Sequence, residues 1–269
     1  MSKKKKSSAL AATSDRLFGI DVSHHQGAID WAKVKAAGVN YCFMKASEGS
    51  TYKDSRFDFN WNQTKANGII RGAYHFFRPN APVSRQVDNL VAKVGKLEVG
   101  DLPPVLDAEV PSSWTRFSVS KRVGMIEEWM VGVEEALGIK PILYLSPSFA
   151  DDVLRNAAEM EKYILWLAHY TSRSEPRVPA PWSKSSGWTF WQYSESGKLD
   201  GIGTNTVDLN RFKGSVEDLM KLTVQPRGGD GCTCPCTCTK ELVLHFKRNR
   251  EQHREEAACL TLRNENKHS

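Results

Sequence analysis

The chain has 269 residues, of which 40% are hydrophobic and 25% are charged, a composition typical of a globular protein. No apolar run approaches the roughly 18 residues that a membrane-spanning helix requires, so we expect no membrane insertion. The net charge of +6 lies at the two ends, since residues 19–222 carry 24 basic and 24 acidic side chains. This neutral body argues against a nucleic-acid partner, which would favour a basic stripe on the folded part.

Both ends of the chain differ from the body. Residues 1–17 include four consecutive lysines and are predicted to form a flexible basic arm, whose apolar part is too short for a signal peptide. No complete export signal is therefore visible. Residues 223–269 contain five of the six cysteines, four of them in a C-x-C-x-C-x-C run that differs from the C-x2-C of a zinc site. We expect a disordered polar tail, with metal capture as the alternative.

Apolar patterning and helix stop signals divide the body into alternating strands and helices. Strands are predicted at residues 18–24, 40–47, 69–77, 103–111, 140–146, 163–170, 187–194 and 206–212. Helices are predicted at residues 30–37, 55–67, 83–97, 118–137, 147–158 and 215–222, with Asp30 and Ser118 as N-caps. Three prolines between residues 176 and 181 argue against a helix before the seventh strand. Cys42 falls inside an apolar strand and is interpreted as a small buried hydrophobe.

Strand–helix alternation favours a parallel sheet with right-handed crossovers. Eight such strands predict an α/β fold, a closed TIM-like (β/α) barrel with an incomplete helical coat, because helices follow only the first five strands. We assign residues 18–222 to this single barrel domain.

The fourth strand, Pro103-Pro-Val-Leu-Asp-Ala-Glu-Val-Pro111, ends in two acids. Residues two apart in a strand point the same way, so Asp107 and Glu109 should share one face, with backbones about 7 Å apart. Like charges at this spacing should raise one pKa, which suits a general acid beside a charged partner.

In a parallel barrel the functional groups gather where the strands end. Four of the eight predicted strands carry an acid there, and aromatic residues supply much of the remainder: Asp21, Glu48, Tyr74, His75, Asp107, Glu109, Tyr144, His169, Tyr170, Gln192, Tyr193 and Asp208. Carboxylates can protonate a leaving oxygen and stabilise a cationic transition state, and aromatic rings bind the apolar face of a pyranose. The pattern therefore favours a sugar-cleaving enzyme.

Two alternatives remain at this point. The carboxylates with His24, His25 and His75 could hold a metal, although adjacent histidines in a strand point to opposite faces. A non-catalytic carbohydrate-binding barrel would share the aromatic residues but should lack the acid at position 109. A Cys42–histidine nucleophilic pair is less favoured, because no sequence feature activates that thiol.

Seven motifs in order resemble glycoside hydrolase family 25, the Chalaropsis-type lysozymes or N-acetylmuramidases. They are Gly19-Ile-Asp-Val-Ser-His-His-Gln-Gly27, Ile29-Asp-Trp31, Lys45-Ala-Ser-Glu-Gly49, Gly72-Ala-Tyr-His-Phe76, Asp107-Ala-Glu109, Trp191-Gln-Tyr193 and Val207-Asp-Leu-Asn210. The resemblance spans residues 18–222 and implies a flattened barrel of eight strands with about five main helices. It also implies cleavage of the β-1,4 bond from N-acetylmuramic acid to N-acetylglucosamine in peptidoglycan, with no metal and no other cofactor.

Carried over by position, the resemblance makes Glu109 the general acid and Asp107 the group that stabilises a positively charged intermediate, with the substrate's 2-acetamido group as a possible participant. Asp21 and Asp208 match the other cleft acids. The implied sugar contacts are Tyr74, Tyr144, Trp166, Tyr170 and Gln192, of which the aromatic residues could instead be simple core packing. Lys45 and Glu48 are interpreted as a structural ion pair. We expect a monomer that acts on glycan strands of the cell wall.

Overall fold

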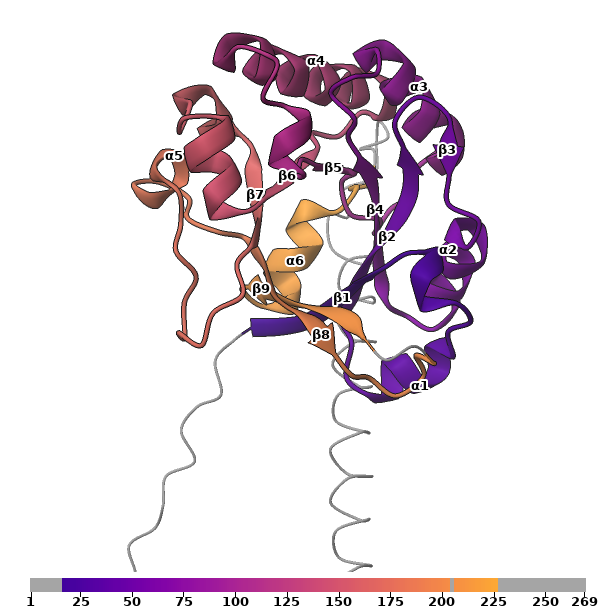
Figure 1. The fold of residues 1–269 in the computed structure, drawn as a ribbon. Helices are drawn as coiled ribbons and strands as arrows, with labels where there is room; N and C mark the ends of the chain where they lie inside the picture. The colour runs from indigo at the N-terminus through magenta and orange to yellow at the C-terminus, as the bar shows by residue number, and fades with distance from the viewer. Residues whose placement is uncertain (1–15, 204–205, 227–269) are drawn as a thin grey trace, which may run out of the picture.

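A computed structural model of the chain describes residues 16–203 and 206–226 (Figure 1). Within these ranges eight strands form a closed ring: β1 (Arg16–Val22), β2 (Tyr41–Glu48), β4 (Ile70–Phe76), β5 (Val105–Asp107), β6 (Ile142–Leu145), β7 (Ile164–Ala168), β8 (Phe190–Gly197) and β9 (Val207–Lys213). Pairing of β1 with β2 closes the barrel, and the short strand β3 (Tyr52–Lys53) pairs with β2 outside it. The predicted eight-stranded α/β barrel is confirmed. Residues 1–15 of the predicted basic arm and almost all of the cysteine-containing tail lie outside the described residues, so the predictions for them stay predictions. Arg16 and Leu17, assigned to the arm, instead belong to β1.

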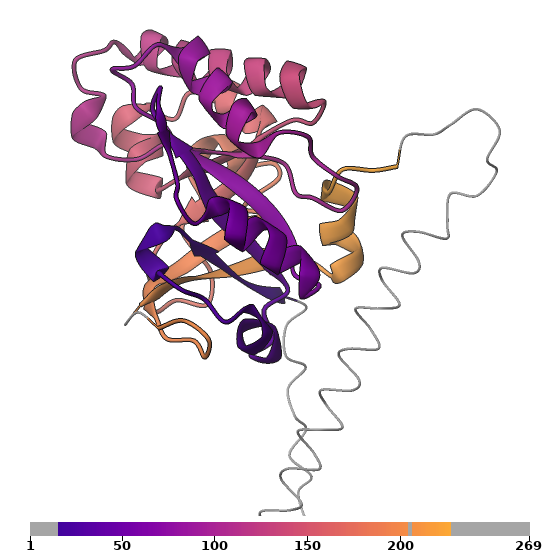
Figure 2. The ribbon, with the colours of Figure 1, turned by 90° about the vertical axis from the view of Figure 1, so that its right-hand side faces the viewer.

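Helices cover only part of the barrel, as predicted. Five described α-helices have six or more residues, namely α1 (Trp31–Ala36), α2 (Phe57–Ala66), α3 (Val83–Val94), α4 (Val119–Leu137) and α6 (Val216–Leu222). Helices α3 and α4 lie side by side on the outer surface (Figure 2). The side chains of Asp30 and Ser118 accept hydrogen bonds from the first turns of α1 and α4, so both N-cap predictions are confirmed.

The barrel interior is packed with aromatic side chains. Phe43 from β2 stacks on Trp166 from β7 with ring centroids 4.5 Å apart, and Phe190 from β8 meets Phe43 edge-on. Gly72 on the neighbouring strand leaves room for this packing, because a Cβ there would lie 2.5 Å from the Phe43 ring. Helix α6 packs against the same cluster and closes the end of the barrel where the parallel strands begin. The opposite end remains open.

The expectation of an all-parallel sheet was wrong for β9, which runs antiparallel to both β8 and β1. Only nine residues separate β8 from β9, and such a short connection suits antiparallel neighbours, whereas parallel strands need a longer crossover. The reversal brings the start of β9 to the open end of the barrel. Asp208 therefore pairs in register with Asp21 at the end of β1.

Two predicted helical features need correction. The helix expected at residues 147–158 begins at residue 147 but ends after the π-helical turn η3 (Phe149–Val153), because Arg155 and Asn156 adopt positive φ. The prolines before β8 do not prevent a helix, since the four-residue α5 (Ala180–Ser183) begins after Pro179. Proline is tolerated in the first helical turn, where its missing N–H needs no partner.

The folded body extends slightly beyond its predicted end at residue 222. The backbone of Val224 donates to the carbonyl of Asp101 and accepts from the N–H of Gly100, at 2.8 and 3.0 Å. Cys42 is fully buried in β2, as predicted, and burial raises the pKa of its thiol.

Candidate active site

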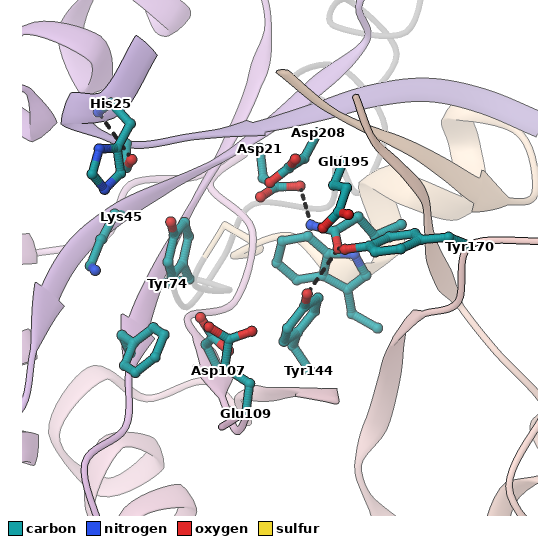
Figure 3. A pocket seen from close by; sticks show the side chains of 14 residues that line it. Asp21, His25, Lys45, Tyr74, Asp107, Glu109, Tyr144, Tyr170, Glu195 and Asp208 are labelled. Carbon is teal, nitrogen blue, oxygen red and sulfur yellow. Dashed lines mark hydrogen bonds between the residues drawn. The ribbon is translucent and has the colours of Figure 1, made fainter. Parts of the chain in front are cut away.

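A cavity of about 380 Å³ lies at the open end of the barrel (Figure 3). It forms where the parallel strands end and where the antiparallel β9 begins, so all eight barrel strands or their adjoining turns contribute side chains. The residues that line it are Asp21, Ser23, His25, Lys45, Tyr74, Phe76, Asp107, Glu109, Tyr144, Trp166, Tyr170, Gln192, Glu195 and Asp208. All nine site residues predicted from the sequence are among them, which leaves their individual roles to be tested.

The local geometry of the two central acids differs from the expected strand. β5 ends at Asp107, so Glu109 does not lie on the pleat of the strand. Val110 adopts a left-handed conformation with φ 57°, and the η2 turn (Pro111–Ser113) follows. The indole N–H of Trp114 donates to the Glu109 carbonyl at 3.0 Å and anchors this turn. A tight turn, rather than strand alternation, therefore brings Glu109 to the cavity beside Asp107.

Burial dominates the electrostatics of these two acids. The pKa of Asp107 is raised well above its usual range by burial and then by the nearby charge of Glu109. The pKa of Glu109 is also raised, first by burial, while Lys45 and Arg78 oppose the rise. Like-charge repulsion was expected to raise one of the two pKa values, but burial is the main cause of both increases. Such a pair retains a proton at a pH where ordinary carboxyl groups are ionised.

Gln192 from β8 connects the aromatic and acidic sides of the cavity. Its Oε1 accepts from the hydroxyls of Tyr144 and Tyr170 at 2.8 and 2.7 Å, and its Nε2 donates to Asp21 Oδ2 at 2.9 Å. Asn210 donates to the same Asp21 oxygen at 2.7 Å. This network fixes the orientation of side chains from four strands before any substrate arrives.

Trp166 continues the network into the barrel interior. Its indole N–H donates to Asn210 Oδ1 at 2.8 Å, and its ring packs edge-on against Tyr144. Only 2% of Trp166 is exposed, so most of its surface is core packing and only an edge reaches the cavity. Tyr170 is 47% exposed and presents far more ring surface to a ligand.

Asp21 and Asp208 form a second carboxyl pair across β1 and β9. Burial raises the pKa of Asp21, although hydrogen bonds from Gln192 and Asn210 act in the opposite direction. Burial and the adjacent Asp21 raise the pKa of Asp208 to about 9. Asp208 is therefore protonated near neutral pH and can donate a hydrogen bond to Asp21.

Some lining residues were not assigned to the site by sequence analysis: Ser23, His25, Lys45, Phe76 and Glu195. The predicted Lys45–Glu48 ion pair is confirmed at 2.6 Å, yet Lys45 also reaches the cavity. Position just after a predicted strand was a usable signal for both His25 and Glu195, which directly follow the strands predicted at residues 18–24 and 187–194.

The histidines do not converge as a metal site would require. His24 and His25 lie in the turn η1 (His24–Gln26), not in a strand, with ring centroids 4.0 Å apart. His24 Nδ1 contacts Asp54 Oδ2 at 2.8 Å, away from the cavity that His25 lines. His75 is buried, bonded to Ser47 and Gln86, and burial lowers its pKa to about 4. Among the described residues, no group of three or more histidine, cysteine or acidic side chains is arranged to hold a metal ion.

A second cavity of about 520 Å³ adjoins the first. Four residues line both cavities, namely Glu109, Tyr144, Tyr170 and Glu195. The remaining wall comes from the turns after β5, β6 and β7, including the η3 segment that replaces the expected helix. The two hollows thus form one groove, with Glu109 at their junction.

Comparison with known proteins places this site in a family. The sequence pattern described as Glycosyl hydrolases family 25 matches residues 20–202. The uncharacterized protein YegX of Escherichia coli (strain K12) is 38% identical over 209 residues, which make up 76% of this chain and 72% of that protein. Lysozyme M1 of Streptomyces globisporus is 36% identical over 218 residues, covering 78% of this chain and 72% of the lysozyme.

Solved structures agree with the sequence comparison. The bacterial lysozyme from Streptomyces coelicolor superposes with a TM-score of 0.72 at 36% identity, covering 79% of this chain and 98% of the lysozyme. The family GH25 lysozyme from Aspergillus fumigatus superposes with a TM-score of 0.69 at 29% identity, covering 77% and 99%. No helix within the described ranges is long and apolar enough to cross a membrane. The chain belongs to glycoside hydrolase family 25, the family of these lysozymes and muramidases.

Proposed function

We propose that the chain is an N-acetylmuramidase, a lysozyme that hydrolyses the β-1,4 bond between N-acetylmuramic acid and N-acetylglucosamine in peptidoglycan. The observation that carries the proposal is the position of Glu109, a half-buried carboxyl group with a raised pKa at the junction of two cavities. A glycan lying along the groove would place a glycosidic oxygen beside this group. Family membership supports the choice of substrate.

Glu109 is proposed as the general acid that protonates the leaving oxygen. Both carboxyl groups of the Asp107–Glu109 pair have raised pKa values, so the pair holds a proton in mildly acidic solution. Lys45 favours ionisation of both acids, whereas a substrate N–H bonded to Asp107 would favour ionisation of Asp107 alone. The proton then resides on Glu109, which faces the junction where a leaving sugar would sit.

Asp107 is proposed to stabilise the positive charge that develops at the sugar. Its buried Oδ1 accepts no hydrogen bond from any residue that the structure describes. A buried oxygen without a partner is costly, and a donor from the substrate would satisfy it. The N–H of the 2-acetamido group is a donor of suitable chemistry, which is consistent with participation of that group in the reaction.

The experiment compares Glu109→Gln with Asp107→Asn on purified cell walls and on an aryl glycoside whose leaving group needs little protonation. Glu109→Gln should reduce turnover on walls by about 10²-fold or more, since general acid catalysis contributes roughly 10²–10⁴-fold. The aryl substrate should partly rescue Glu109→Gln and should not rescue Asp107→Asn.

Mass analysis of the released sugars identifies the bond that is cleaved. Products with N-acetylmuramic acid at the reducing end support the proposal, and products that end in N-acetylglucosamine contradict it. Equal rescue of both variants would mean that a carboxyl group other than that of Glu109 is the general acid. Binding of walls without any sugar release would favour the non-catalytic barrel, and loss of activity on chelation with recovery on added zinc would favour the metal hydrolase.

A further inference from the structure

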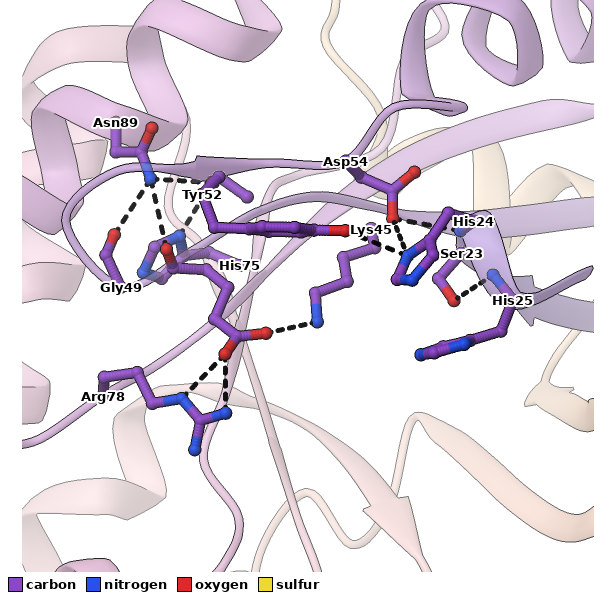
Figure 4. Close-up of polar contacts among 12 residues, drawn as sticks. Ser23, His24, His25, Lys45, Gly49, Tyr52, Asp54, His75, Arg78 and Asn89 are labelled. Atoms are coloured by element: carbon purple, nitrogen blue, oxygen red, sulfur yellow. Dashed lines mark hydrogen bonds and ion pairs between the residues drawn. The ribbon is translucent and has the colours of Figure 1, made fainter. Parts of the chain in front are cut away.

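The ammonium group of Lys45 is held in a fixed place at the wall of the active-site cavity (Figure 4). Its Nζ lies 4.9 Å from the ring centroid of Phe76 and 5.5 Å from that of Tyr52. Glu48 accepts from it at 2.6 Å, and the side chain of Lys45 is only 10% exposed. Two aromatic faces and one carboxylate therefore restrict a side chain that is usually flexible.

We call the Phe76 ring, the Tyr52 ring and the Glu48 carboxylate around Lys45 the cage. The backbone around this cage is also fixed. A shift in register between β2 and β4 at residues 45–47 redirects the strand next to the site, as bulges beside active sites commonly do. The amide of Asn89 on α3 donates to the carbonyls of Gly49 and Tyr52, at 2.9 and 3.0 Å. These bonds tie the β2–β3 turn, and with it the Tyr52 ring, to the helix layer.

Glu48 sets the net charge of the cage. Its Oε2 binds Lys45 and its Oε1 binds the guanidinium of Arg78 at 2.6 and 2.8 Å, so one anion stands between two cations. Arg78 also stacks on Phe76, on whose ring Lys45 rests as well. The three charges leave an excess of one positive charge beside the carboxyl cluster.

Several charged groups face Asp107 and Glu109 across the cavity. The acids are Asp21 from β1, Glu48 from β2, Glu195 from β8 and Asp208 from β9. Lys45 and Arg78 are the cations, and His25 lies on the same wall. Lys45 favours the ionised form of both central acids, whereas Glu48 favours the protonated form. The fixed charge of Lys45 therefore favours ionisation of Asp107 and Glu109, and the surrounding acids favour their protonation.

We propose that Lys45 is a positioning residue whose caged charge sets the protonation of the Asp107–Glu109 pair, and that Glu48 tunes this effect by partly neutralising it. The inference rests on the proposed roles of those two acids and adds a specific source for their charge balance. A purely structural ion pair would hold β2 together without affecting the titration of the acids. The two readings therefore predict different results when either charge is removed.

The test uses Lys45→Met and Glu48→Gln in the full chain. Loss of the cation should raise the pKa values of the central acids, and loss of the anion should lower them. On the Coulomb scale of a protein surface, one unit charge beside the pair shifts these pKa values by a few tenths of a unit to about one unit. The two variants should therefore move the pH profile of kcat/KM in opposite directions by amounts in this range.

Lys93→Met is the matched control. Lys93 lies 5.6 Å from the ring centroid of Phe57 and pairs with Asp58 at 2.9 Å, an arrangement of the same chemistry away from the cavity. This substitution should leave the pH profile unchanged. Any loss of melting temperature shared by the Lys45 and Lys93 variants then measures the removed ion pair alone.

Titration of side-chain carboxyl carbons by NMR gives the same pKa values without turnover, with Glu109→Gln and Asp107→Asn used for assignment. Opposite shifts in the two charge variants support the inference even if the wild type cleaves another bond. Shifts below 0.2 units in both variants, or shifts of the same sign, would overturn it. If the two charge variants show these shifts but the wild-type chain releases no sugar from walls, only the proposed function is refuted.

Discussion

Replacement of Gln192 by methionine tests whether the hydrogen-bond network at the cavity floor organises the site. Gln192 is 3% exposed and makes three side-chain hydrogen bonds, with Tyr144, Tyr170 and Asp21. Methionine has a similar length but cannot replace any of these bonds. The tyrosine hydroxyls and the Asp21 carboxyl group would then lose a partner in a buried environment.

The size of the effect follows from the type of each bond. The two bonds between neutral groups contribute about 1 kcal/mol each, and a bond to a charged group contributes about 1.5–3 kcal/mol. We expect the free energy of unfolding to fall by about 4 kcal/mol, which corresponds to a melting temperature about 8–16 °C lower for a domain of this size. Because Gln192 opposes the increase in the Asp21 pKa, that pKa should rise further in the variant.

The assay combines thermal unfolding with wall lysis measured well below the melting temperature. Gln86→Met is the control, since Gln86 is fully buried and makes four side-chain hydrogen bonds outside the cavity. Both variants should lose stability, but Gln192→Met should lose at least ten times more activity. A Gln192→Met protein as stable as the wild type, or equal activity losses in the two variants, would refute the reasoning.

Two further predictions concern titration and backbone strain. Because the pKa of Asp208 is raised to about 9, the folded state binds more protons than the unfolded state between about pH 4 and 9, so stability should fall as the pH rises through this window. Asp208→Asn should make the melting temperature less dependent on pH, and an unchanged slope would contradict this assignment. Val110 has a positive φ that is unfavourable for a β-branched residue, by about 1–3 kcal/mol. Val110→Gly should therefore retain or slightly increase the melting temperature while kcat falls, because the turn that positions Glu109 becomes more flexible; a large loss of stability would show that Val110 is held mainly by its contacts.

The sequence determined the barrel because local signals agree along most of its length. Asp30 and Ser118 start helices where capping predicts, and apolar strands alternate with helices up to β6. Side chains at the ends of such strands must meet at one mouth, which is why all nine predicted site residues line one cavity.

Tertiary structure alone decided how those residues interact. Gln192 and Asp21 are 171 positions apart in the chain, and no local propensity encodes their hydrogen bond. The direction of β9, which places Asp208 beside Asp21, depends on strand pairing across the closed barrel rather than on the apolar pattern of the strand. The cage around Lys45 likewise depends on Phe76 from another strand, β4. Short-range periodicity specifies which face of an element is buried, whereas contacts between distant elements determine charge, orientation and strain at the site.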